Sequence, residues 1–237
     1  NFAIASIDTK FVDVNTAYLE ILTTFNFDPD LTSSTSSATE TLIQDTINTY
    51  FSNNLQRFGK VFRRSNLLAI LDDIDESILN TKISIKIQKR FTPSLGLSRD
   101  YQINFPVEIG SATSTSAVET IITSSKFTFN SKPCTIRNRL NSNTLEIINN
   151  SEGVEVDNIG SFDSKAGSVN LVGFNPTALG GGEIKISARP ANESTIRPLR
   201  ASIIDIDTAA SKANAVLDYQ DIQASLSGST SSSGSSY

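Results

Sequence analysis

The densest cluster of side chains that can do chemistry is acidic: Asp72, Asp73, Asp75 and Glu76 fall within five residues. Carboxylate oxygens are the ligands that Ca²⁺ prefers, but a calcium loop also needs a regular spacing of ligands and usually a glycine for its turn. The run Asp-Asp-Ile-Asp-Glu-Ser has neither. We therefore interpret it as the end of a helix that leads into a strand, and we predict no metal site.

A second acidic pair, Asp205 and Asp207, alternates with Ile204 and Ile206. Two carboxylates on either side of a glycosidic bond can act as acid and as nucleophile or base. The alternation instead predicts a strand whose isoleucines are buried and whose two aspartates face solvent. We predict no catalytic residue, and a carboxylate hydrolase remains an alternative that Asp205→Asn would test.

Two other motifs have structural interpretations. Gly180, Gly181 and Gly182 precede a predicted strand, whereas a phosphate-binding loop places its glycines before a helix. We therefore predict a turn there. Cys134 is the only cysteine in the chain, which excludes an internal disulfide and a thiolate zinc cluster. We interpret it as an inert buried residue.

The main basic cluster consists of Arg57, Lys60, Arg63 and Arg64, with Phe58 and Phe62 between them. Basic residues interleaved with aromatic residues are typical of nucleic-acid binding. The whole chain is acidic, however, with a net charge of −5 and a pI of about 4.8. A contact with another protein is therefore the preferred interpretation, and nucleic acid is not expected as a partner.

The composition excludes several further classes of protein. The 237 residues include no histidine, so a Ser-His-Asp triad and an imidazole metal ligand are both impossible within this chain. No apolar run approaches the roughly 18 residues of a membrane helix, so we expect no membrane span. The chain also lacks methionine and begins with Asn1, which indicates a processed product or part of a longer polypeptide. We expect a non-enzymatic protein without cofactors.

Hydrophobic periodicity predicts an α/β unit over residues 1–97. Residues 18–27 are rich in aromatic and β-branched side chains and predict a strand. A capping box at Ser37 and Glu40 opens an amphipathic helix with an apolar stripe, and Ser65 caps a second, shorter helix. The stripe consists of Leu42, Ile43, Ile47, Tyr50, Phe51 and Leu55. A short strand at 60–62 and an alternating strand around residues 83–87 complete a βαβαβ-type sheet covered by two helices.

Residues 98–224 predict an antiparallel β-rich domain, because short strand-like runs recur between turn signals. The expected strands are 101–107, 120–129, 144–148, 169–174, 183–188, 201–207 and 215–220. A helix at 208–215 is an alternative for part of this stretch. Residues 225–237 form a Ser/Gly-rich tail that cannot bury a core. The predicted fold class is therefore α+β, with the α/β unit followed by the β-rich domain.

Several of these motifs, taken in order, resemble a known family. The first unit is similar to the C-terminal part of baseplate J-like proteins. It carries Tyr18-Leu19-Glu20-Ile21, a long helix, Phe58-Gly59-Lys60-Val61-Phe62, Ser65-Asn66-Leu67-Leu68 and Ile83-Ser84-Ile85. The second unit resembles the baseplate wedge subunits of T4-like contractile-tailed phages, of the gene-product-six type. Its motifs are the run at 158–169 and Ile196-Arg197-Pro198-Leu199-Arg200, followed by Ile203-Ile204-Asp205-Ile206-Asp207.

The resemblance implies a virion structural protein without enzymatic activity, of which this chain would be the C-terminal part. Members of this family dimerise and join other wedge proteins, and the wedges close into a ring around the hub. Rearrangement of that ring triggers contraction of the sheath. The implied partners are therefore a second copy and other baseplate wedge proteins within a large symmetric assembly. The implied location is the tail baseplate of the virion, assembled in the cytoplasm of the host bacterium.

The segment 196–207 is apolar and lies near the end of the chain, so we predict that it contributes to a subunit interface. The candidate interface residues are Ile196, Leu199, Ile203, Ile204 and Ile206. Packing in the core of the β domain is the alternative for the same residues.

A different class of protein also fits the low charge and the 34 serines and 23 threonines. This alternative is an extracellular β-rich adhesin or glycan-binding module. Such modules stack sugars on exposed aromatic residues, and here tryptophan is absent and tyrosine numbers five.

Overall fold

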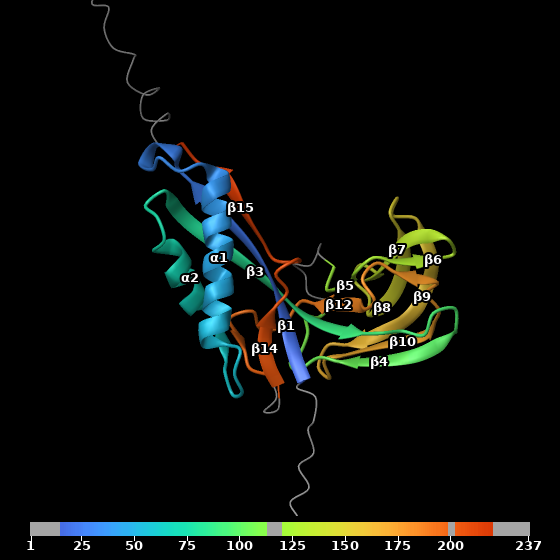
Figure 1. The fold of residues 1–237 in the computed structure, drawn as a ribbon. Coiled ribbons are helices and arrows are strands. Elements are labelled where there is room, and N and C mark those ends of the chain that lie inside the picture. The colour runs from blue at the N-terminus through green and yellow to red at the C-terminus, as the bar shows by residue number, and fades with distance from the viewer. Residues whose placement is uncertain (1–14, 113–119, 199–201, 220–237) are drawn as a thin grey trace, which may run out of the picture.

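The computed structural model of the chain describes residues 15–112, 120–198 and 202–219. Within these ranges the chain forms two α-helices, a short 3-10 helix and fifteen strands (Figure 1). The helices are η1 (Pro29–Leu31), α1 (Ser36–Asn54) and α2 (Arg64–Asp72). The strands are β1 (Asn15–Phe27), β2 (Phe62–Arg63), β3 (Ile78–Phe91), β4 (Arg99–Asn104), β5 (Ile122–Ser124), β6 (Phe127–Phe129), β7 (Lys132–Asn138), β8 (Thr144–Asn149), β9 (Val154–Asp163), β10 (Ser168–Phe174), β11 (Ala178–Leu179), β12 (Ile184–Ala188), β13 (Thr195–Ile196), β14 (Ser202–Ile206) and β15 (Lys212–Leu217). The fold is α+β and rich in strands, as predicted.

Thirteen of the strands form one mixed, mostly antiparallel sheet. Its main path runs β14-β1-β3-β12-β5-β7-β8-β9-β10-β4, and β6, β11 and β15 join at its sides. The long strand β3 pairs with β1 through residues 78–88 and with β12 through residues 87–91. Strand β3 therefore joins two halves of the sheet. The first half contains β14, β15, β1 and β3, and the second contains β12, β5, β7, β8, β9, β10 and β4 with β6 and β11.

Helices α1 and α2 cover one face of β1 and β3 (Figure 1). The alternation in β3 places Ile83, Ile85 and Ile87 on this covered face, where each is at most 3% exposed. The β1–β3 register sets Ile85 opposite Ile21 and Ile87 opposite Leu19. Burial of a side chain of this size stabilises the fold by about 1.5–3 kcal/mol. A register slip of one residue would move all of them to the other face, so the pattern fixes this pairing.

Helix α1 presents most of the predicted stripe to the sheet. Ile43, Ile47, Tyr50 and Phe51 are buried, and Leu55, at its C-terminal cap, is buried as well. The prediction is wrong for Leu42, which is 47% exposed. Leu42 lies at the margin of the stripe, on the side of the helix that carries the exposed Asp45 and Thr49.

The start of α1 differs from the predicted capping box. Thr35 is the N-cap, and its hydroxyl accepts a hydrogen bond from the Ala38 amide at 3.2 Å. Ser37 lies inside the helix, and the Glu40 carboxylate accepts a hydrogen bond from the Ala215 amide of β15 at 2.8 Å. The capping box is therefore wrong, because the helix begins two residues earlier than predicted: Ala38 takes the third position after the N-cap, and Glu40 bonds β15 instead.

Helix α2 also begins without the predicted cap. Its N-cap residue is Arg63, which makes no side-chain capping hydrogen bond, and Ser65 lies within the helix. The preceding strand β2 pairs with β13, which holds this end of the helix in place instead.

In the second half of the sheet, the predicted strands correspond to β4, β8, β10 and β12. The predicted strand 120–129 is divided into β5 and β6, because Ser125 turns to exchange hydrogen bonds with Lys185. The prediction missed β7 and β9. Each contains a short alternation that the prediction did not use, Cys134-Thr135-Ile136-Arg137 in β7 and Val154-Glu155-Val156-Asp157 in β9, although Pro133 and Gly160 interrupt the longer pattern.

The last two strands return to the first half of the sheet. Strands β14 and β15 both pair in parallel with β1, end to end along the same edge. Their predicted place among antiparallel partners is therefore wrong. The predicted helix at 208–215 is also wrong, since a turn at residues 207–211 leads directly into β15. The predicted tail, residues 225–237, lies outside the described residues.

Candidate functional site at the sheet junction

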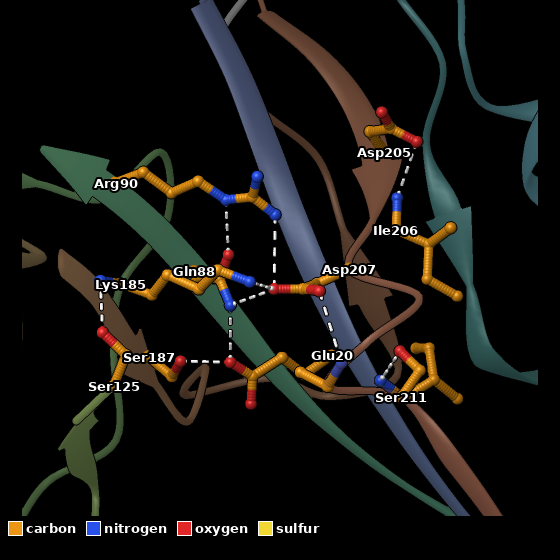
Figure 2. A network of polar contacts seen from close by, with 12 residues as sticks. Glu20, Gln88, Arg90, Ser125, Lys185, Ser187, Asp205, Ile206, Asp207 and Ser211 are labelled. Atoms are coloured by element: carbon orange, nitrogen blue, oxygen red, sulfur yellow. Dashed lines mark hydrogen bonds and ion pairs between the residues drawn. The ribbon is translucent and has the colours of Figure 1, made fainter. Parts of the chain in front are cut away.

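Polar side chains gather where the two halves of the sheet meet. They come from three neighbouring strands and surround the carboxylate of Asp207, which directly follows β14 (Figure 2). Strand β1 contributes Glu20, β3 contributes Gln88 and Arg90, and β12 contributes Lys185 and Ser187. The junction is defined by these six residues.

The carboxylate of Asp207 is the centre of the junction and is 3% exposed. Its Oδ2 accepts hydrogen bonds from Lys185 Nζ at 2.5 Å and from Gln88 Nε2 at 2.8 Å. The Arg90 guanidinium lies 3.2 Å from the same oxygen. The Ala210 amide donates to Oδ1 at 3.3 Å. A buried carboxylate is stable only when it is paired and hydrogen-bonded, and all of these donors meet that need.

The pKa of Asp207 reflects two opposing effects. Burial raises the pKa, because it disfavours the charged form, but the hydrogen bonds from Lys185 and Gln88 and the charge of Lys185 lower it. The net result is a pKa below the ordinary value for an aspartate. Asp207 is therefore ionised at neutral pH despite its burial.

The fully buried Gln88 links the centre of the junction to the other strands. Its Nε2 also donates to Glu20 Oε1 at 2.8 Å, and its Oε1 accepts from Arg90 Nε at 2.7 Å. The Ser187 hydroxyl donates to the same Glu20 carboxylate oxygen. Both ends of the amide are thus paired, as buried polar groups require.

The turn after Asp207 is inserted between β14 and β15 along the edge of β1. The Asp207 amide donates to the Leu19 carbonyl, and the Ser211 amide donates to the Asp207 carbonyl, each at 2.9 Å. The Ser211 hydroxyl accepts from the Ile21 amide at 3.0 Å. The backbone and the side chain of Asp207 therefore join the C-terminal segment to both β1 and β12.

The arrangement suits a structural clamp better than a reactive centre. The two cations beside Asp207 are paired with it, and Arg90 also lies 3.6 Å above the Tyr18 ring. A small cavity of about 280 Å³ adjoins the junction and is lined partly by Glu20, Lys185 and Ser187. These groups already bond one another, so the geometry holds strands together rather than activating a nucleophile.

The structure separates the acidic pair predicted from the sequence. Asp205 is half-buried on β14, and its Oδ1 accepts from Gln56 Nε2 at 2.7 Å and from the Ile206 amide at 2.8 Å. The prediction that both aspartates face solvent is wrong for Asp207. The strand ends at Ile206, and the turn directs Asp207 into the junction.

The acidic run at 72–76 lies at the end of α2 and in the turn before β3, as predicted. Asp75 accepts from the Ser77 amide at 2.9 Å, and bonds to Ser77 lower its pKa. Across the described ranges, no group of three or more His, Cys, Asp or Glu residues is arranged to hold a metal ion.

The basic cluster is interrupted in the structure. Phe62 is fully buried and stacks on Phe51 with ring centroids 5.9 Å apart, so only Phe58 of the two interleaved phenylalanines is exposed. Arg64 lies 3.6 Å from Glu193, which lowers the positive charge of the patch.

The glycine run and the cysteine lie as predicted. Gly180, Gly181 and Gly182 form the turn between β11 and β12. Cys134 is fully buried in β7, and burial raises the pKa of its thiol.

The candidate interface residues divide into two groups. Ile196, Ile204 and Ile206 are buried within the chain itself, as the alternative of core packing predicts. Ile203 is half-buried on β14 opposite Thr16, and Leu199 lies outside the described residues. The interface stays a prediction.

Sequence reasoning missed five of the six junction residues. Gln88 occupies a position of β3 whose alternation predicts solvent exposure, a prediction that is correct for Lys82 but wrong for Gln88. Only the pairing of β12 beside β3 covers it, and no local pattern carries that information. A serine and a lysine in the short run 184–188 are likewise ordinary for a strand that faces solvent.

No helix in the described part of the chain is long and apolar enough to cross a membrane. A search of curated proteins finds no match to this chain. Residues 15–90 match the family model described as baseplate structural protein gp6, C-terminal domain III. The matched segment contains β1, α1, β2, α2 and nearly all of β3, which is the stretch on which the first resemblance was based. The predicted resemblance is thus confirmed over residues 15–90, which are similar to C-terminal domain III of the phage baseplate structural protein gp6.

Proposed function

We propose that the chain is a structural subunit of the wedge in the baseplate of a contractile phage tail. The observation that carries this proposal is the match of residues 15–90 to domain III of baseplate protein gp6, a family that is structural rather than catalytic. In this role the chain dimerises and joins other wedge proteins into a ring around the hub. The ring then transmits the rearrangement that triggers sheath contraction.

The fold supports a mechanical role of this kind. Strand β3 runs through both halves of the sheet, and the junction around Asp207 ties the C-terminal segment to β1 and β12. A sheet that is continuous and clamped by charged groups resists separation of its halves. As part of the proposal, residues 1–97 form the α/β unit and residues 98–224 the β-rich unit, with β14 and β15 returning from the second to the first.

The location follows from the same proposal: the virion tail baseplate, after assembly in the host cytoplasm. Immunogold labelling of intact virions, with antibodies against this chain, tests it directly. Label confined to the baseplate at the end of the tail supports the proposal. Label on tail fibres, together with specific binding on a glycan array, would replace it with the adhesin alternative.

A further inference from the structure

The face of the first half-sheet opposite the helices is open and basic. Lys82 and Lys86 alternate with the buried isoleucines of β3, so they point away from α1 and α2. On β15, Lys212 alternates with Ala213 and therefore lies on the same face as Asn214. We call Lys82, Lys86 and Lys212 the lysine face.

The lysine face borders a hollow of about 630 Å³ whose floor can form hydrogen bonds. The hollow is lined by Lys82 and Lys86 with Leu22, Thr24, Ser84 and Asn214. Among the described residues, none of the three lysines makes an ion pair. Glu20 lies opposite Lys86 in the β1–β3 register, but its carboxylate accepts hydrogen bonds from Gln88 and Ser187 and forms no ion pair with Lys86. Within the described residues, the lysine face is thus a positive surface whose charge Glu20 offsets only in part.

The complementary surface is at one end of the same half-sheet, where η1, the turn from α2 to β3 and the end of β15 meet. The Asp28 amide donates to the Ser77 carbonyl and the Asp218 amide to the Phe27 carbonyl, each at 2.9 Å. This acidic tip consists of Asp30, Asp72, Asp73, Asp75, Glu76 and Asp218, whereas Asp28 is buried beneath it. No lysine or arginine occurs in residues 26–34, 71–80 or 217–219.

We propose that the lysine face of one chain receives the acidic tip of a second copy. The argument is charge complementarity: a chain with a net charge of −5 concentrates unpaired negative charge at one end and unpaired positive charge in a neighbouring hollow. The two surfaces lie on one sheet, and six residues separate Glu76 from Lys82, the nearer lysine of β3, which is about 20 Å in an extended chain. Within one chain this separation exceeds the screening length at physiological salt, so each surface is free for a partner.

This inference rests on the proposed function, in which the chain self-associates. Sedimentation equilibrium of the purified chain over a wide concentration range tests both. The key variant is Lys82→Glu with Lys86→Glu. The matched control is Lys126→Glu with Lys165→Glu, which changes the net charge equally at exposed sites in two turns of the second half of the sheet.

The expected result is a wild-type dimer or larger species whose dissociation constant rises roughly tenfold or more in the Lys82→Glu/Lys86→Glu variant, and also on adding salt. The control should associate as the wild type does. A third variant, Asp72→Lys with Asp73→Lys, should also be weakened, and mixing it with Lys82→Glu/Lys86→Glu should restore association in a mixed species.

Two results overturn the inference in distinguishable ways. If the lysine-face variant and the control associate equally strongly, the lysine face is not the contact surface, although the chain still self-associates. A wild-type chain that stays monomeric at every concentration removes the contact and, with it, the dimerisation in the proposed function.

Discussion

The junction at Asp207 gives the most specific prediction for stability, through Asp207→Asn. Asparagine keeps the volume of the side chain but removes its charge and turns one oxygen into a donor. That donor must face either the Ala210 amide or the cluster of Lys185, Gln88 and Arg90, which are donors as well. In either orientation a buried polar group loses its partner.

The magnitude follows from how far the freed groups can reach water. Breaking a fully buried ion pair costs about 3–5 kcal/mol of unfolding free energy. The side chains of Lys185 and Arg90 are 31% and 24% exposed, so both can recover part of their hydration. We therefore expect a loss of about 2–3 kcal/mol, which for a chain of this length lowers the melting temperature by about 5–10 °C.

Differential scanning calorimetry at neutral pH measures this change, and Asp205→Asn is the matched control. The control carboxylate is half-buried and has one side-chain partner, Gln56, so its loss should cost about 0.5 kcal/mol or less. Equal melting temperatures for the two variants would refute the assignment of Asp207 as the centre of a clamp. A double-mutant cycle with Lys185→Met then measures the interaction free energy between Asp207 and Lys185.

Three further predictions follow from particular residues. The pKa of Asp207 is lower in the folded state than in the unfolded state, where it is about 4. The ionised carboxylate therefore contributes its full stabilisation above the unfolded pKa and loses it as the pH falls through the folded pKa. The melting temperatures of wild type and Asp207→Asn should converge only in acid. In Gly160→Ala the new Cβ would lie 2.0 Å from the Asn170 carbonyl oxygen at φ +150°, so we expect a loss of about 2–3 kcal/mol by chemical denaturation, whereas Gly181→Ala, with nothing within 4 Å, should be neutral. Cys134 is fully buried with a raised thiol pKa, so a thiol reagent should modify it only under denaturing conditions, and rapid reaction of the native chain would contradict its placement.

Local patterns in the sequence predicted the elements whose signal is local. The period of two in β3 and the 3.6-residue stripe of α1 each depend on neighbours within one element, and both are present in the structure. The caps and the pairing partners were less predictable. Helix α1 has its N-cap at Thr35 instead of Ser37, so Glu40 lies beyond the capping position and bonds the Ala215 amide of the distant strand β15. These contacts depend on which distant strands pair, and a window of ten residues contains no information about that pairing.

The junction illustrates the same limit at the candidate site. Gln88, Lys185 and Ser187 are ordinary residues for the solvent face of a strand, and they become a buried network only when β12 pairs with β3. Asp207 looked like the partner of Asp205 because both follow an isoleucine. Because β14 ends at Ile206, Asp205 lies on the strand and is half-buried, whereas Asp207 lies in the turn that follows and is buried.

The C-terminal return also bears on what the family-matched segment can do alone. Residues 15–90 contain β1, whose outer edge is covered in this structure by β14 and β15. In helix α1, Glu40 accepts from the Ala215 amide and Gln44 donates to the Ser211 carbonyl at 2.6 Å, so these two side chains bond that edge. Without residues 202–217, β1 would be an open edge strand beside unpaired acceptors and donors, which is a template for uncontrolled pairing. We therefore expect the matched segment and the C-terminal strands to fold together, although more than a hundred residues separate them in the sequence.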